Sequence, residues 1–233
     1  MGVLRHTTTR SVMQILMLLN LLVTAVSSTS IVTTLAGTDA SGATDGSAAA
    51  STFGIQSDVV RTSDGSILYI ADTGNNKIRA LNLVASTVST IAGSGQSGYA
   101  DGFGTNANFS NALRNLALTS DDGTLFVADG LFVRYVILGT GKVGTLAGVF
   151  MDKPYSQDGS SLQDQVSFGG VYSLALSSDD STLYVGDYGS VRRLTILGSG
   201  EELHTDASTL SISLSQVPSI SWLGSVTALA LSE

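Results

Sequence analysis

The stretch LYIADTGNNKIRAL at residues 68–81 decides the fold, because it has the pattern of a strand, a tight turn and a second strand. The pattern returns as LFVADGLFVR at residues 125–134 and as LYVGDYGSVR at residues 183–192. The aspartate recurs after 57 and 58 residues, and the arginine recurs after 55 and 58. A period of this size indicates a repeat architecture.

Other segments recur around this hairpin with the same period. One ends in Thr-Leu-Ala-Gly or Thr-Ile-Ala-Gly, at residues 34–37, 90–93 and 145–148. A loop rich in Gly, Ser and Ala follows each copy, and it contains an Asp-Gly turn and a lone phenylalanine that we expect to anchor the loop. A short apolar strand such as Leu-Ala-Leu-Thr then precedes the hairpin. The pattern of each repeat therefore predicts four short strands and one long loop, and this combination is typical of a β-propeller blade.

We accordingly expect an all-β fold of four-stranded antiparallel blades at residues 56–93, 112–148 and 171–214. Residues 31–37 have the pattern of a detached outer strand, and residues 226–231 that of a detached inner strand. In the third blade the outer strand has lost its signature, and only the alternation of Leu210, Ile212 and Leu214 indicates it. Three full blades with partial flanking strands make an incomplete propeller. Because open sheet edges favour association, the sequence predicts self-association or a second chain that completes the ring.

The N-terminal residues 1–27 have the features of a secretory signal peptide: a basic lead, an apolar run and small residues before the expected cleavage point. The run is too short for an ordinary membrane span, and the alternative is an uncleaved anchor. A single glycosylation sequon begins at Asn108. These features predict a secreted or cell-surface glycoprotein without a membrane span once the signal is removed.

Composition excludes several classes of function. The chain has no Cys and only two His, so thiolate chemistry, His-rich zinc sites and Ser-His-Asp triads are disfavoured. The formal charge of −8 repels phosphate backbones, which argues against nucleic-acid binding.

The hairpin at residues 70–79, IADTGNNKIR, closely resembles the signature of NHL-repeat propellers. The resemblance covers residues 31–200 and includes the Thr-Leu-Ala-Gly, Asp-Gly and Phe series. It implies a secreted, long-repeat propeller whose N-terminal outer strand completes the last blade, and residues 31–37 fit that strand. The sequence departs from the family at Asn76, where His is frequent, and lacks the Pro-x-Gly after each Phe.

Two sets of charged residues recur inside the hairpins. The aspartates favour a structural role in the turns, together with Gly74 and Gly189; the alternative is an acidic ring that binds a cation such as calcium. The arginines favour pairing with carboxylates across strands; the alternative is a groove for acidic partners. The two sets are Asp72, Asp129 and Asp187, and Arg79, Arg134 and Arg192.

The Asp-Gly loops are the predicted ligand surface, because binding residues concentrate on loops of a rigid scaffold. Their aspartates are Asp45, Asp101 and Asp158. The alternative is that these Gly-rich loops are merely flexible. The sequence thus predicts a non-catalytic module that binds a protein or glycan, with no catalytic residue, metal ligand or required cofactor. The alternatives are a calcium-dependent lactonase or hydrolase, and a truncated fragment without function.

Overall fold

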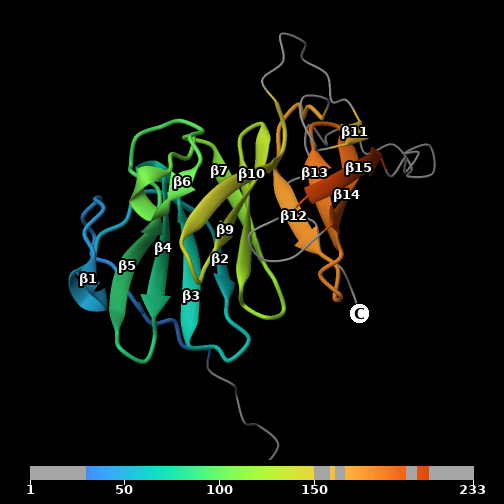
Figure 1. Ribbon diagram of the computed structural model, residues 1–233. Helices are drawn as coiled ribbons and strands as arrows, with labels where there is room; N and C mark the ends of the chain where they lie inside the picture. The colour runs from blue at the N-terminus through green and yellow to red at the C-terminus, as the bar shows by residue number, and fades with distance from the viewer. Residues whose placement is uncertain (1–29, 150–157, 161–165, 198–203, 210–233) are drawn as a thin grey trace, which may run out of the picture. The chain divides into compact units, whose positions relative to one another are not determined.

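The computed structural model describes residues 30–149, 158–160, 166–197 and 204–209. The chain forms two units, residues 1–34 and 35–233, and all three sheets belong to the second. Within the described residues, regular structure consists of strands and three single-turn 3₁₀ helices. The strands form three antiparallel sheets of five strands each (Figure 1). The predicted all-β fold is confirmed.

The first sheet contains four long strands and one very short one, in the order β1-β5-β4-β3-β2. The long strands are β2 (Gln56–Arg61), β3 (Ile67–Asp72), β4 (Lys77–Asn82) and β5 (Thr87–Ala92). Strand β1 (Gly46–Ser47) comes from the Asp-Gly loop and pairs with the outer edge of β5. The predicted four-stranded blade therefore carries a fifth strand of two residues, which covers part of its edge.

The second and third sheets repeat this order. The second consists of β6 (Gly102–Phe103), β7 (Leu113–Leu118), β8 (Thr124–Asp129), β9 (Phe132–Ile137) and β10 (Lys142–Ala147). The third consists of β11 (Gly159–Ser160), β12 (Ser173–Leu176), β13 (Thr182–Asp187), β14 (Ser190–Leu197) and β15 (His204–Thr209). In all three, the second strand along the chain lies at one edge, and the short first strand lies at the other.

The central hairpin of each sheet turns at a residue with positive φ. In the first repeat the helix η2 (Thr73–Asn75) occupies the turn, and Asn76 closes it in the left-handed conformation with φ 52°. In the later repeats the turn shortens to two residues, with Gly130 at φ 66° and Gly189 at φ 75°. Asn and Gly adopt this conformation at low cost, and the glycines allow the two-residue loops of the later repeats.

The packing of strand β8 explains why its four central residues, Leu125–Ala128, are all apolar. Leu125 and Val127 pack in a core with Ala71 and Ile78 of the first sheet. The alternate residues Phe126 and Ala128 pack in a second core with side chains of the third sheet, including Leu174 and Val185. Successive side chains of a strand point to opposite faces, so both faces of β8 are buried between neighbouring sheets.

The strands β2, β7 and β12 connect neighbouring sheets at their inner edges. The Asp58 carboxylate accepts hydrogen bonds from the Asn115 amide group, at 2.6 Å, and from the Leu116 backbone N–H, at 2.7 Å. The Asn115 side-chain oxygen accepts one from the Leu174 backbone N–H, at 2.6 Å. The three sheets are thus consecutive blades of a β-propeller, with β2, β7 and β12 as inner strands.

Within the described residues, 31–37 form no strand. Their pairing with a last blade stays a prediction, because that blade lies outside the described residues. One predicted outer strand is wrong. The outer strand of the third sheet is β15, earlier than the alternation from Leu210 to Leu214. Residues 210–214, 226–231 and the proposed signal 1–27 lie outside the described residues.

Candidate functional site

Arg79 lies at the centre of a polar cluster that is buried under the Asp-Gly loop. Its side chain is completely inaccessible to solvent. The guanidinium forms ion pairs with Asp72 at 2.8 Å and with Asp45 at 2.7 Å. It also donates to the backbone carbonyls of Thr44 and Thr52, at 2.9 Å and 3.2 Å. The ring of Phe53 lies 5.0 Å from the guanidinium carbon, which adds a cation–π contact.

The same cluster recurs in the other blades. Arg134 pairs with Asp129 at 3.2 Å and with Asp101 at 2.8 Å. Arg192 pairs with Asp158 at 2.8 Å and lies 3.5 Å from Asp187. The phenylalanine rings lie 5.5 Å and 4.7 Å from these guanidinium carbons. We call each set of arginine, two aspartates and phenylalanine a blade lock; the two rings are Phe109 and Phe168.

The loop aspartates predicted to bind a ligand belong to the blade locks. Their side chains are 43%, 55% and 44% exposed in Asp45, Asp101 and Asp158. Asp45 also accepts a hydrogen bond from the Thr90 backbone N–H at 3.0 Å. Burial alone would raise the pKa of Asp45, but the bonds from Thr90 and Arg79 outweigh it and lower that pKa from 3.8. The ligand role of these aspartates stays a prediction, and their observed contacts hold the loop on its own blade.

The hairpin aspartates bind the loop more than their own turns. Asp72 accepts from the Gly54 backbone N–H at 2.8 Å, and Asp129 from the Ser110 N–H at 2.9 Å. Asp187 accepts from Gly170 and also from Tyr188 in its own turn. Burial raises the pKa of the Asp129 carboxyl, although Ser110 and Arg134 oppose the shift. These carboxylates therefore fix each loop to its blade. The spacing of residues within the hairpin does not reveal that the loop is their partner.

The two glycines assigned to the turns are required for different reasons. A Cβ on Gly74 would lie 2.6 Å from the Ile55 backbone nitrogen, so this position needs close backbone approach. Gly189 has no neighbour within 4 Å of such a Cβ, but its φ of 75° favours glycine. The sequon residue Asn108 is half-buried, and its side chain accepts a hydrogen bond from Ser94 at 2.6 Å. Its glycosylation stays a prediction.

The sequence predicts that the three arginines pair with carboxylates across strands, but it does not reveal that their side chains are buried. Arg79 and Arg134 are 0% exposed and Arg192 is 1% exposed. The signal that could have found the cluster is the joint recurrence of Arg, two Asp and Phe in all three repeats. Four residues that recur together in every repeat are better explained by one shared contact than by separate surface roles.

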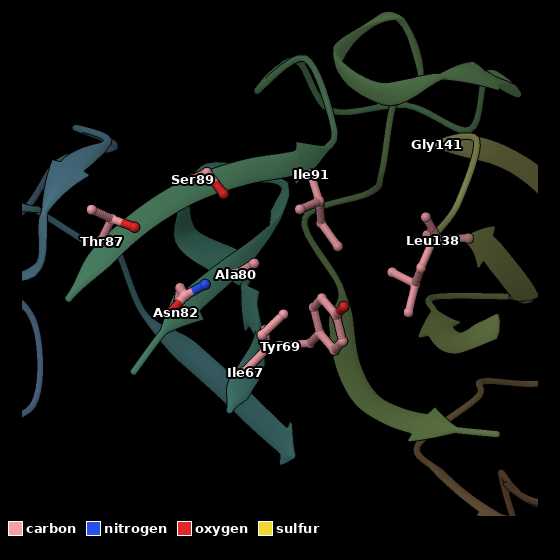
Figure 2. Close-up of a pocket in the computed structure, with 10 residues that line it drawn as sticks. Ile67, Tyr69, Ala80, Asn82, Thr87, Ser89, Ile91, Leu138 and Gly141 are labelled. Atoms are coloured by element: carbon pink, nitrogen blue, oxygen red, sulfur yellow. The ribbon is translucent and has the colours of Figure 1, made fainter. Parts of the chain in front are cut away.

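Within the described residues, two of the hollows lie between neighbouring blades. The first, of about 300 Å³, is bordered by outer and middle strands of the first two sheets; Figure 2 shows Tyr69, Ile91 and Leu138 around it. Its lining residues are apolar or uncharged. This hollow offers uncharged hydrogen-bonding groups, such as Asn82 and Ser89, but no charged side chain.

The second hollow, of about 380 Å³, lies where the inner strands begin, and we call it the inner-strand groove. It is lined by Ile55, Ser57, Thr73, Asn111, Ala112, Leu113, Arg114 and Tyr172. The guanidinium carbon of Arg114 lies 4.5 Å from the centre of the Tyr172 ring. Arg114 is exposed, and it makes no ion pair with any residue in the described ranges. This groove therefore has a cation available to a ligand.

Within the described ranges, no three His, Cys, Asp or Glu residues lie together in a way that could hold a metal ion. The calcium-binding alternative stays a prediction. Over the same part of the chain, no helix has the length and apolar character needed to cross a bilayer.

Comparison with known proteins gives limited matches. No family model matches the chain. Over 86 residues, or 36% of its length, the chain is 40% identical to Protein SUPPRESSOR OF QUENCHING 1, chloroplastic, from Arabidopsis thaliana. The chain spans only 8% of the length of that relative.

Solved structures with similar folds match at TM-scores below 0.5. An auxiliary nutrient binding protein from Bacteroides thetaiotaomicron aligns with 55% of this chain and 34% of its own, at 18% identity and a TM-score of 0.46. The nidogen/laminin complex aligns with 69% of this chain and 61% of its own, at 14% identity and a TM-score of 0.44. The propeller assignment therefore depends on the sheets of the chain itself.

Proposed function

We propose that this chain is a secreted, NHL-type propeller segment that serves as a binding module for a protein or glycan. The ligand occupies the inner-strand groove, and an acidic group of the ligand pairs with Arg114. The ligand site is thus placed at the groove rather than at the Asp-Gly loops. The loop carboxylates already bind arginines of their own blades.

The observation that carries this proposal is a break in the repeat. Ser57, Arg114 and Tyr172 occupy equivalent positions in the three inner strands. In the first two repeats the next residue, Asp58 or Asn115, accepts a hydrogen bond from the following inner strand. The blade locks are the same in every repeat, as expected of parts that maintain the fold. A position that differs in every repeat, beside a hollow, is free to recognise a ligand.

The chemistry of the groove favours an acidic group. Arg79, Arg134 and Arg192 are neutralised by their own carboxylates, whereas Arg114 lies over the Tyr172 ring and forms no ion pair with a described residue. The N–H groups of such a guanidinium match a carboxylate in two-point hydrogen bonding. Ile55, which is 77% exposed, adds an apolar contact at the rim.

Binding arrays of glycans and peptides, each containing acidic and neutral members, test this function. The wild-type chain is expected to bind acidic members, and Arg114→Met should weaken that binding by about tenfold or more, as expected for a lost charged hydrogen bond. The matched control is Arg61→Met, which removes another exposed arginine outside the groove. Absence of binding, or equal binding by both variants, would contradict the proposal.

A further inference from the structure

A tyrosine fills the space between the second and third blades near their outer strands. Tyr135 of β9 faces Phe126 across β8 and Gly144 across β10. It is 7% exposed and belongs to the core that the second and third blades share. A Cβ on Gly144 would overlap the Tyr135 ring and hydroxyl, so the glycine leaves room for the ring to lie over the outer strand.

The first blade has an alanine where the second has this tyrosine. Ala80 occupies the position of Tyr135, because the strand register gives it equivalent neighbours: the aromatic Tyr69 across β3 and the small Ser89 across β5. Ala80, Tyr69 and Ser89 all line the first hollow (Figure 2). The hollow therefore lies where the first blade lacks a ring that the second blade supplies.

The opposite wall of the hollow is equivalent in the two interfaces. Val136 and Leu138 of the second blade line the first hollow. Leu194 and Ile196 hold the equivalent positions in the third blade, as the strand register and the backbone hydrogen bonds show, and they pack in the core that contains Tyr135. Both walls are aliphatic. The first hollow thus keeps the surface that receives an aromatic ring and lacks only the ring.

The size and charge of the hollow suit a small neutral molecule. Its volume of about 300 Å³ exceeds the roughly 150 Å³ of a cavity that holds benzene. Burial raises the pKa of the Tyr69 hydroxyl, and the charge of Asp122 raises it further, so Tyr69 stays neutral at ordinary pH. A charged ligand would lose hydration against an uncharged lining without gaining a counter-ion.

Polar groups border one side of the hollow. Thr87 and Ser89 are exposed, and their hydroxyls can donate or accept. The Asn82 side-chain oxygen accepts from the Ala85 backbone N–H at 2.8 Å, so the amide group of Asn82 is what it offers to a ligand. An aromatic ring with one hydroxyl matches this combination of aliphatic wall and polar edge.

We propose that the first hollow binds a small neutral phenol, whose ring takes the place that Tyr135 fills between the next two blades. Ile91 and Leu138 contact the ring, and Asn82, Thr87 or Ser89 bonds its hydroxyl. This site is separate from the inner-strand groove, and its ligand is not the acidic one proposed there.

NMR titration of the full-length wild-type chain with para-cresol, which is the tyrosine side chain as a free molecule, tests the site. We expect saturable binding with a dissociation constant on the order of 1 mM, as is usual for so small a ligand. Nuclear Overhauser effects should connect the ligand ring to the methyl groups of Ile91, Val136 and Leu138. No saturation, or contacts with other methyl groups only, would overturn the proposal.

A charged analogue tests the class of ligand. The anion para-toluate has a similar size, and it should bind about tenfold or more weakly than para-cresol, because its carboxylate finds no cation in the lining. Equal or tighter binding of para-toluate would overturn the assignment of a neutral ligand.

A double variant tests the structural reason for the hollow. Ala80→Tyr with Ser89→Gly copies the pair of Tyr135 and Gly144 into the first blade, and it should weaken para-cresol binding about tenfold or more because the ring fills the site. The control is Ala49→Tyr, which adds a tyrosine at an exposed residue outside the hollow and should bind as the wild type does. Unchanged binding by the folded double variant would overturn the proposal, and the wild-type titration decides it if the variant does not fold.

Discussion

Arg79 and Asp72 form a 2.8 Å ion pair in which neither side chain is accessible to solvent. The pair joins β4 to β3 inside one blade, and the second carboxylate of the arginine, from Asp45, comes from the preceding loop. A buried charge is tolerated only where partners satisfy it. The blade lock meets this requirement with two carboxylates, backbone carbonyls and an aromatic ring.

Removal of the arginine should destabilise the fold strongly. Arg79→Met leaves Asp72 buried without its counter-ion, and we expect a loss of about 3–5 kcal/mol in the free energy of unfolding. Arg114→Met is the matched control, because Arg114 is exposed, and should change stability by less than about 1 kcal/mol. Urea denaturation measures both values. Similar losses in the two variants would contradict a structural role for the buried pair.

The two aspartates of one lock should differ in importance. Asp72→Asn removes the fully buried partner of Arg79 and should cost about 3 kcal/mol or more. Asp45→Asn removes a partner that is 43% exposed, and water screening limits its effect to about 1 kcal/mol. Thermal denaturation of both variants gives the order. A larger effect at Asp45 would show that the loop contact dominates the lock.

Asp179 predicts how stability changes in acid. Hydrogen bonds from Ser177, and then from Ser181, lower the pKa of Asp179 from 3.8 to about 2. Its folded pKa lies below its unfolded value, so its contribution is present above pH 4 and is lost as the pH falls toward 2. The urea midpoint of the wild type should therefore fall over this range, and Asp179→Asn should show a smaller fall. Equal slopes for the two proteins would contradict the assignment.

Asp129 should act in the opposite direction. Burial raises the pKa of its carboxyl above 3.8, despite bonds from Ser110 and Arg134. A raised folded pKa means that the folded state binds the proton more readily than the unfolded state. Acidification through this pKa therefore removes an unfavourable contribution to the stability of the fold. Carbon NMR of the Asp129 carboxyl should give a midpoint above 3.8. A midpoint below this value would show that the hydrogen bonds and Arg134 outweigh burial.

Gly74 should not accept a side chain. A Cβ there would lie 2.6 Å from the Ile55 nitrogen, so Gly74→Ala must displace backbone and should cost on the order of 1–3 kcal/mol. Gly139→Ala is the control, because nothing lies within 4 Å of a Cβ at that exposed turn. Denaturation midpoints of the two variants provide the measurement. An equal loss in both would contradict the close approach at Gly74.

The sequence predicted the blades because their information is local. The recurring apolar strands and glycine turns specify hairpins, and the continuous apolar run from Leu125 to Ala128 belongs to a strand that is buried on both faces. The outer strands were harder to predict, because whether a segment becomes a strand depends on the neighbour with which it can pair as well as on its own pattern. The Thr-Leu-Ala-Gly pattern of residues 34–37 matches the end of β5, yet among the described residues only β5 has a strand to pair with.

The candidate site was predicted less well. Periodicity drew attention to residues that recur, such as Asp45 and Arg79, and these proved to be partners of each other. Arg114 and Tyr172 meet only after two blades pack side by side, and neither belongs to a recurring motif. A pattern search finds what all repeats share, whereas a ligand groove depends on what one of them does differently.

The short spacing of each blade lock has a consequence for the duplication of blades. Asp45 and Arg79 are 34 residues apart, Asp101 and Arg134 are 33 apart, and Asp158 and Arg192 are again 34 apart. Each blade thus carries its own blade lock within one continuous segment of the chain. Duplication of such a segment would keep each arginine with its carboxylates, and only the inner-strand contacts between neighbouring blades would have to be formed anew.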